Sequence, residues 1–201
     1  IHNIRRPKPD DFQIKQAVEK IQNSKNPIII SGGGVFYSDA MEELSNFAVK
    51  HNIPVTQTVM GYSTMKRDHS HFVGPIGGLG GKAANNLAKE TDLAICIGTK
   101  LADFTTGSWA NFENPQFKLV SINIARHDAN KHLAEAVIGD AKVSLIELSN
   151  ALGDWRSSDS WHKKSQDELK SWNEYVDKES GPTNQELPSY AHAVGAIYRN
   201  S

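Results

Sequence analysis

The alternation of short apolar runs with helical segments constrains the fold of this chain more than any other feature of its sequence. We read five apolar runs as strands: residues 27–30, 53–58, 92–97, 119–124 and 136–138. Segments whose apolar residues recur at helical spacing separate these runs, and the last of them spans 141–152. Strands that alternate with helices form parallel sheets with right-handed crossovers. We therefore predict an α/β fold: a Rossmann-like, doubly wound parallel sheet of five or six strands, followed by a polar helical extension.

Composition and charge exclude several classes of function. The 201 residues are 38% hydrophobic, which is enough for one sizeable core. The 22 basic and 23 acidic residues nearly cancel, so the chain lacks the broad basic field of a nucleic-acid-binding protein. No stretch approaches the roughly 20 apolar residues that span a bilayer, and we expect neither a membrane partner nor a signal peptide. The single cysteine, Cys96, lies in an apolar run, which is typical of a cytoplasmic protein.

Shifts in composition divide the chain into four parts. Residues 1–10 start with isoleucine and contain most of the polar stretch RRPKPDD at 5–11, which predicts an interdomain linker. Residues 11–152 carry the strand and helix pattern and form the predicted central domain. Residues 153–188 are polar and predict a helical extension followed by a linker. Residues 189–201 have an amphipathic helical pattern, which we interpret as the truncated start of a further domain, so we expect a longer parent protein.

Glycine turns after the predicted strands are the main candidates for a ligand site. Residues 32–34, 58–61 and 98–100 each follow a strand, and Asp103 lies near the third turn. A further cluster, GPIGGLGG at 74–81, does not directly follow a predicted strand. In open parallel sheets ligands bind beyond the carboxyl ends of the strands, where glycine lets backbone N–H groups approach a pyrophosphate. Neither GxGxxG nor the P-loop pattern is present, so the turns predict either a dinucleotide site or tight corners without a ligand.

Other residues give weaker signals for a site. His69 and His71 have no third histidine to complete a metal site, so we interpret them as part of a solvated loop. His127 and His132 flank a predicted helix start and are expected at the surface. Ser31 lacks the GxSxG pattern of a strained nucleophile. We predict no metal site and no catalytic residue in this chain.

Two predictions concern the helices. Asp10 with Asp11, and Ser38 with Asp39, precede helical patterns and predict helix N-caps. The polar extension carries three sparse tryptophans, Trp155, Trp161 and Trp172. We interpret these side chains as anchors that pack the extension on the domain, and not as an aromatic platform for a substrate.

In their serial order these stretches resemble a known family. The order is GGG, IPVTQTVMGYST, GPIGGLGGKAANNLAKETDLAICIGTKLADFTTG, KLVSINIARHDANK and GDAKVSL. It resembles the central domain of thiamine-diphosphate-dependent enzymes of the acetolactate synthase type, over about residues 12–152. The resemblance implies a Rossmann-like domain between an N-terminal pyrimidine-binding domain and a C-terminal pyrophosphate-binding domain. The flanks RRPKPDD and LPSYAHAVGAIYRNS fit that plan.

Within the family, two longer stretches are similar to the branch that hydrolyses trihydroxycyclohexanedione in bacterial inositol catabolism. They are VMGYSTMKRDHSHFVGPIGGLGGKAANNLAKETD and TKLADFTTGSWANFENPQFKLVSINIARHDANKHLAEAV. This resemblance implies an oligomeric enzyme, a dimer or tetramer, that opens a cyclic 1,2-diketone by hydrolytic C–C cleavage and yields 5-deoxy-glucuronate. Thiamine diphosphate and Mg²⁺ would do the chemistry. The family's relay glutamate and its Gly-Asp-Gly metal motif belong to the flanking domains, so the piece alone is expected to be inactive.

Acetolactate synthases hold FAD at the glycine turns of this domain. The resemblance assigns that site to Gly32, Gly33, Thr58, Gly77, Gly98, Lys100 and Asp103. Here Lys100 and Phe104 stand where those enzymes carry arginines, and Asn123 replaces an acidic residue. Because an arginine fork binds a diphosphate better than lysine, and phenylalanine carries no charge, we expect a weak or vestigial nucleotide site without FAD.

Alternative functions stay open at this point. A FAD-containing carboligase of the acetolactate synthase type would share the fold and the turns. A stand-alone nucleotide-binding or regulatory module would share the fold alone. A NAD-dependent deacylase has a related topology, but one cysteine cannot make its four-cysteine zinc ribbon. Our main hypothesis is a scaffold that holds two catalytic domains and lends loops to the substrate entrance.

Overall fold

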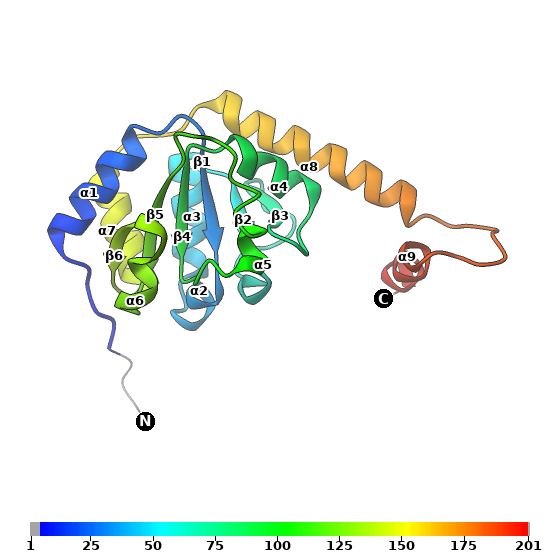
Figure 1. Ribbon diagram of the computed structural model, residues 1–201, viewed down its shortest axis with the longest axis horizontal. Helices are drawn as coiled ribbons and strands as arrows, with labels where there is room; N and C mark the ends of the chain where they lie inside the picture. The colour runs from blue at the N-terminus through cyan, green and yellow to red at the C-terminus, as the bar shows by residue number, and fades with distance from the viewer. Residues whose placement is uncertain (1–4, 201) are drawn as a thin grey trace.

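A computed structural model describes residues 5–200, which fold around one six-stranded parallel sheet (Figure 1). The strands are β1 (Pro27–Ser31), β2 (Val55–Gln57), β3 (Phe72–Pro75), β4 (Leu93–Ile97), β5 (Lys118–Asn123) and β6 (Glu135–Ile138). They lie in the order β3-β2-β1-β4-β5-β6, and every neighbouring pair is parallel. The predicted Rossmann-like, doubly wound fold is confirmed, and its strand order reverses between β1 and β4.

Helices cover both faces of the sheet. They are α1 (Asp11–Gln22), α2 (Gly33–Tyr37), α3 (Met41–His51), α4 (Lys82–Glu90), α5 (Asp103–Thr106), α6 (Arg126–Ala129), α7 (Ala141–Leu152), α8 (Asp159–Glu179) and α9 (Tyr190–Asn200), with 3₁₀ turns η1 (Val59–Gly61) and η2 (Lys131–Leu133). None of these helices is long and apolar enough to cross a membrane. The predicted cap of the first helix is confirmed, because the Asp10 carboxylate accepts the N–H of Phe12 at 2.9 Å.

The core lies in two layers, one on each face of the sheet. Ile29 of β1 packs with apolar side chains of α1, α3 and α7. Its neighbours Ile28 and Ile30 pack on the other face, with α4 and with Trp161 of α8. Successive side chains of a strand point to opposite faces, so a strand covered on both sides reads as an uninterrupted apolar run.

The polar extension is anchored as predicted. Trp161 is 3% exposed, and its indole Nε1–H donates a hydrogen bond to the carbonyl oxygen of Pro27 at 2.8 Å. Trp155 packs against the core on the α1 side, and Trp172 against the core on the α4 side. From these contacts α8 runs away from the sheet, and α9 follows beyond its far end (Figure 1). Residues 1–4 of the predicted linker and Ser201 of the predicted truncated helix lie outside the described residues.

Two local predictions are wrong. Strand β3 was not predicted, and the GPIGGLGG cluster starts inside it, so these glycines do follow a strand. Ser38 and Asp39 do not cap α3, whose first residue follows Ala40 without a side-chain cap. The Ser38 hydroxyl donates instead to the Asp140 carboxylate at 2.9 Å. That buried carboxylate also accepts the guanidinium of Arg6 at 3.1 Å and caps α7, so Ser38 serves a tertiary contact.

Candidate functional site

The carboxyl ends of all six strands meet at one edge of the sheet, the lower edge in Figure 1. Because every strand is parallel, each turn that follows a strand starts at this edge. The edge therefore carries all the predicted site residues that directly follow strands, from Gly32 after β1 to Gly98 after β4. The expectation that the glycine corners line one rim is confirmed.

The corners after β1 and β4 are pressed against each other. A Cβ atom on Gly32 would lie 2.4 Å from the carbonyl oxygen of Gly98, and one on Gly34 would lie 2.5 Å from its Cα. Gly98 also has φ of +60°, where a side chain is strained. Glycine is thus required for the contact between two backbone segments.

The backbone N–H groups of these corners already have partners. Gly32 donates to the carbonyl of Ile97 at 2.8 Å, and Gly34 donates to the carbonyl of Gly98 at 3.0 Å. The N–H of Gly98 in turn donates to the carbonyl of Ile122 at 2.8 Å. An N–H group that cradles a phosphate must be free to point at it. These three donors are used within the fold.

The turn after β2 packs under the first corner. Thr58 donates its N–H to the carbonyl of Ser31 at 2.9 Å, and its hydroxyl oxygen accepts the N–H of Gly61 at 3.0 Å. A Cβ atom on Gly61 would lie 2.1 Å from the carbonyl oxygen of Ser31. A Cβ atom on Gly33 would likewise lie 2.9 Å from the carbonyl oxygen of Met60.

The turn after β3 is tied to α5 and α4. A Cβ atom on Gly77 would lie 2.0 Å from the carbonyl oxygen of Phe104, and the N–H of Gly78 donates to that carbonyl at 2.8 Å. Asn85 exchanges two hydrogen bonds with the backbone of Gly77, at 2.9 and 3.0 Å. Asp103 begins α5 beside this contact and is exposed to solvent.

A cavity of about 300 Å³ opens at the carboxyl ends of β4, β5 and β6. Its walls include Gly98, Lys100, Asn123 and Asp128. The side-chain hydrogen bond from Lys131, at 2.7 Å, lowers the pKa of Asp128, and the positive charges of Lys131, Lys100 and His127 lower it further. The cavity thus combines one carboxylate with nearby cations, and Lys100 is the one predicted side chain that reaches it.

Two asparagines that sequence reasoning did not weigh as contacts hold these turns. Asn85 fixes the turn after β3, and Asn123 fixes the turn after β5. The amide of Asn123 donates to the carbonyl of Thr99 at 3.2 Å and its oxygen accepts the N–H of Ala125 at 2.9 Å. The sequence marked Asn123 only as the replacement of an acidic residue and gave Asn85 no role, so the packing of the turns is what reveals these contacts.

The interpretation of the first histidine pair as a solvated loop is wrong for His71. This side chain is 6% exposed at the opposite, amino edge of the sheet. Its ring stacks on that of His162 of α8, with the ring centroids 4.2 Å apart, and its Nε2 lies 3.3 Å from the Oδ1 of Asn52. His127 and His132 are exposed, as predicted. Within residues 5–200, no group of three or more histidine, cysteine or acidic side chains is arranged as a metal site.

Comparison with known proteins places the chain in a family. Residues 14–148 match the family model described as the thiamine pyrophosphate enzyme, central domain. The chain belongs to this family. The resemblance inferred from the serial order of the glycine turns is therefore confirmed.

Relatives from two bacterial genera carry the same name. A 3D-(3,5/4)-trihydroxycyclohexane-1,2-dione hydrolase of Clostridium perfringens is 40% identical over 87% of this chain. The hydrolase 2 of that name from Bacillus cereus is 44% identical over 79% of the chain. The Bacillus anthracis protein of that name is 36% identical over 97% of the chain. The matched regions span 27%, 25% and 32% of these relatives' own lengths.

Proposed function

We propose that this chain is the central scaffold domain of a thiamine-diphosphate-dependent 3D-(3,5/4)-trihydroxycyclohexane-1,2-dione hydrolase. Such an enzyme hydrolyses a C–C bond of a cyclic diketone in inositol catabolism and yields 5-deoxy-glucuronate. The 40% identity to a hydrolase of that name, over 87% of the chain, carries the proposal. The domain is proposed to span residues 11–152, between a linker at 1–10 and the extension and linker at 153–188, with a further domain starting at 189.

The described residues do not fit thiamine diphosphate or Mg²⁺. The carboxyl edge presents no cluster of three potential metal ligands within residues 5–200. The N–H groups of Gly32, Gly34 and Gly98 donate to neighbouring carbonyls, so these three groups are not free to bind a diphosphate. We therefore assign both groups to other parts of the full-length enzyme, and we propose that the isolated chain is inactive.

The same contacts support a weak or vestigial nucleotide site at Gly32, Gly33, Thr58, Gly77, Gly98, Lys100 and Asp103. Phe104 is 71% exposed and offers a diphosphate no charge, and Lys100 is a point charge where an arginine would be a fork. We propose that FAD is absent. A carboligase of the acetolactate synthase type is not favoured for the same reason.

The proposed enzyme is a cytoplasmic homo-oligomer that acts on a small molecule. Cys96 is fully buried in the sheet, and burial raises the pKa of its thiol, which keeps it unreactive in a reducing compartment. Sedimentation of the full-length protein measures the number of subunits.

Two experiments test the proposal. The full-length protein, supplied with thiamine diphosphate and Mg²⁺, is expected to consume the cyclic diketone and to form no acetolactate from pyruvate. A yellow protein that makes acetolactate would overturn the assignment. Separately, titration of this chain with FAD, ADP and NAD is expected to show no binding below about 1 mM. Tighter binding of any of the three would contradict the vestigial site and leave the hydrolase assignment untouched.

A further inference from the structure

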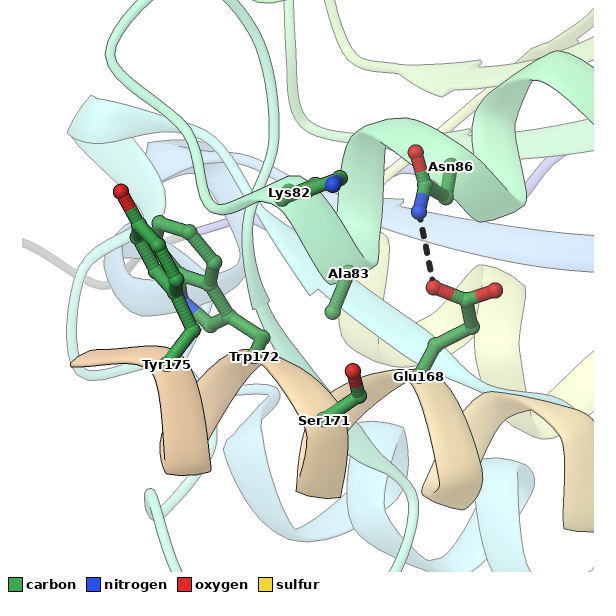
Figure 2. A pocket seen from close by; sticks show the side chains of 7 residues that line it. All are labelled: Lys82, Ala83, Asn86, Glu168, Ser171, Trp172 and Tyr175. Carbon is green, nitrogen blue, oxygen red and sulfur yellow. Dashed lines mark hydrogen bonds between the residues drawn. The ribbon is translucent and has the colours of Figure 1, made fainter. Parts of the chain in front are cut away.

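A groove between α4 and the appended helix α8 remains unused by the proposed function. It encloses about 470 Å³, and its rim carries Lys82, Asn86, Glu168, Ser171, Trp172 and Tyr175 (Figure 2). Two faces of different chemistry line it. The aromatic side chains lie at one end and the hydrogen-bonding side chains of Asn86 and Glu168 at the other.

The aromatic end is held in place by small residues of α4 and the turn before it. The rings of Trp172 and Tyr175 stack with centroids 5.6 Å apart and planes at 23°. A Cβ atom on Gly81 would lie 2.9 Å from the indole Nε1, so glycine is what lets Trp172 seat against this turn. Ala83 is small and buried at the base of the groove, and a longer side chain there would fill it. Tyr175 is 54% exposed, so part of the aromatic wall is open to a ligand.

The polar end is partly organised and partly unused. The amide of Asn86 donates to the Glu168 Oε2 at 2.8 Å, which orients the carboxylate. Within the described part of the chain, the second carboxylate oxygen of Glu168 and the ammonium of Lys82 have no hydrogen-bond or ion-pair partner. A ligand in the groove thus meets an acceptor, a donor and an amide around an aromatic wall.

We propose that this groove binds a neutral polyhydroxylated ring, of the monosaccharide or cyclitol class. The C–H face of such a ring packs on an aromatic side chain, here Trp172, with the Tyr175 ring stacked on the side away from Glu168. Its hydroxyl groups donate to the Glu168 carboxylate and accept from Lys82 and Asn86, and hydrogen bonds to charged groups are the stronger kind. One ammonium and one carboxylate leave the groove without net charge, which disfavours a nucleotide or another multiply charged anion. This inference does not depend on the proposed function.

The test follows the indole Nε1–H resonance of Trp172 by ¹H–¹⁵N NMR of this chain, assigned from a Trp172→Phe variant. Titration with myo-inositol and methyl glucoside is expected to shift it with a Kd on the order of millimolar, while AMP leaves it unshifted. Tyr175→Ala and Glu168→Gln are each expected to weaken binding about tenfold. Both positions are on the groove surface, and an unchanged Nε1–H resonance of Trp161 shows that the variants keep the fold.

Matched controls make the result decisive. Glu174→Gln removes an exposed carboxylate from the same helix, and Tyr37→Ala removes an exposed tyrosine at the carboxyl edge. Neither is expected to change the Kd. No shift at about 100 mM of either polyol, tighter binding of AMP, or equal weakening by the controls would overturn the proposal.

Discussion

The two edges of the sheet are closed in different ways. At the carboxyl edge, glycine corners touch backbone to backbone, while large apolar side chains on the same turns stay uncovered. Five of these are between 61% and 81% exposed: Met60, Tyr62, Leu79, Phe104 and Ile124. At the amino edge, buried polar side chains form hydrogen bonds that fasten the start of α8. Hydrogen bonds within the chain thus hold the amino edge, whereas the carboxyl edge presents an apolar surface of the kind that a partner surface covers.

The amino edge depends on a few well-placed groups. His51 donates from Nδ1 to the carbonyl of Trp155 at 2.8 Å, and its Nε2 lies 3.1 Å from the hydroxyl of Ser149. The hydroxyl of Ser157 donates to the carbonyl of Asn52 at 2.6 Å. Close backbone contact between glycines is found at the carboxyl edge, and side-chain hydrogen bonds to the α8 segment at the amino edge, so the two edges should respond to different substitutions.

The largest effect is expected from a side chain added at the carboxyl edge. Gly98→Ala places a Cβ 2.5 Å from the Gly34 Cα at φ of +60°, and should lower the free energy of unfolding by about 4 kcal/mol. Gly153→Ala is the control, because it has φ of +59° and no atom within 4 Å, and should cost about 1 kcal/mol. Urea denaturation measures both values. Equal losses would mean that the corner contact contributes nothing beyond backbone strain.

The next largest effect is expected at Asn52 on the amino edge. Its amide donates to the carbonyl of Ser157 at 3.2 Å and to Asp159 at 3.1 Å, from a left-handed backbone with φ of 56°. Asn52→Ala should cost about 3 kcal/mol in urea denaturation, because both the hydrogen bonds and the backbone preference are lost. Asn52→Gly keeps the backbone conformation, so it should cost about 1 kcal/mol less. A glycine variant as stable as the unchanged chain would show that the side chain does not fasten α8.

Acid should weaken the amino edge selectively. Burial, with a smaller contribution from the charges of His162, His69 and Arg156, lowers the pKa of His71 from 6.5 to about 4. The folded chain therefore binds this proton more weakly than the unfolded chain does. The stability that depends on neutral His71 is complete above pH 6.5 and is lost as the pH falls towards 4.

The expected loss over that range is on the order of 2 kcal/mol, measured by denaturation at several pH values. Glutamine in His71→Gln does not titrate and can still donate to Asn52. This variant should therefore lose less of its free energy of unfolding between pH 6.5 and 4 than the unchanged chain does. His127→Gln, at an exposed position, should leave the loss unchanged. If the unchanged chain and both variants lose the same free energy of unfolding over this pH range, His71 is not the source of the acid sensitivity.

The smallest effect is expected at the apolar surface of the carboxyl edge. Phe104→Ser should change the free energy of unfolding of this chain by less than about 0.5 kcal/mol, because the ring is 71% exposed. Phe47→Ser, at 1% exposure, should cost about 4 kcal/mol. In the full-length protein Phe104→Ser should weaken contacts between domains, which limited proteolysis detects. A large loss in the isolated chain would show that Phe104 already packs within it.

Sequence patterns predicted the elements whose burial is uniform. The runs around Ile29 and Ile95 read as strands because helices cover both sides of the sheet. The sequence pattern did not predict strand β3 because the strand has only four residues. Two of them are Gly74 and Pro75, which usually indicate a turn. Its pairing with β2 also shifts register next to Val55, so tertiary contact and not local propensity holds it in the sheet.

The position of the candidate site could be predicted from the sequence, but the hydrogen-bond partners of its backbone N–H groups could not. Parallel topology alone puts Gly32, Thr58 and Gly98 at one edge. Whether their N–H groups face a ligand or a neighbouring carbonyl depends on distances of a few tenths of an ångström, which no local pattern encodes. The burial of His71 was also out of reach, because its partner His162 lies in a helix far along the chain.

The indole of Trp161 reaches back to the first residue of the central strand. A chain that stops at Leu152 would therefore leave the carbonyl of Pro27 without this donor and bare the wall of α4 that the indole covers. We therefore expect a piece that ends at Leu152 to be less stable than one that includes Trp161, and during synthesis this contact with β1 forms only after residue 161 has been added.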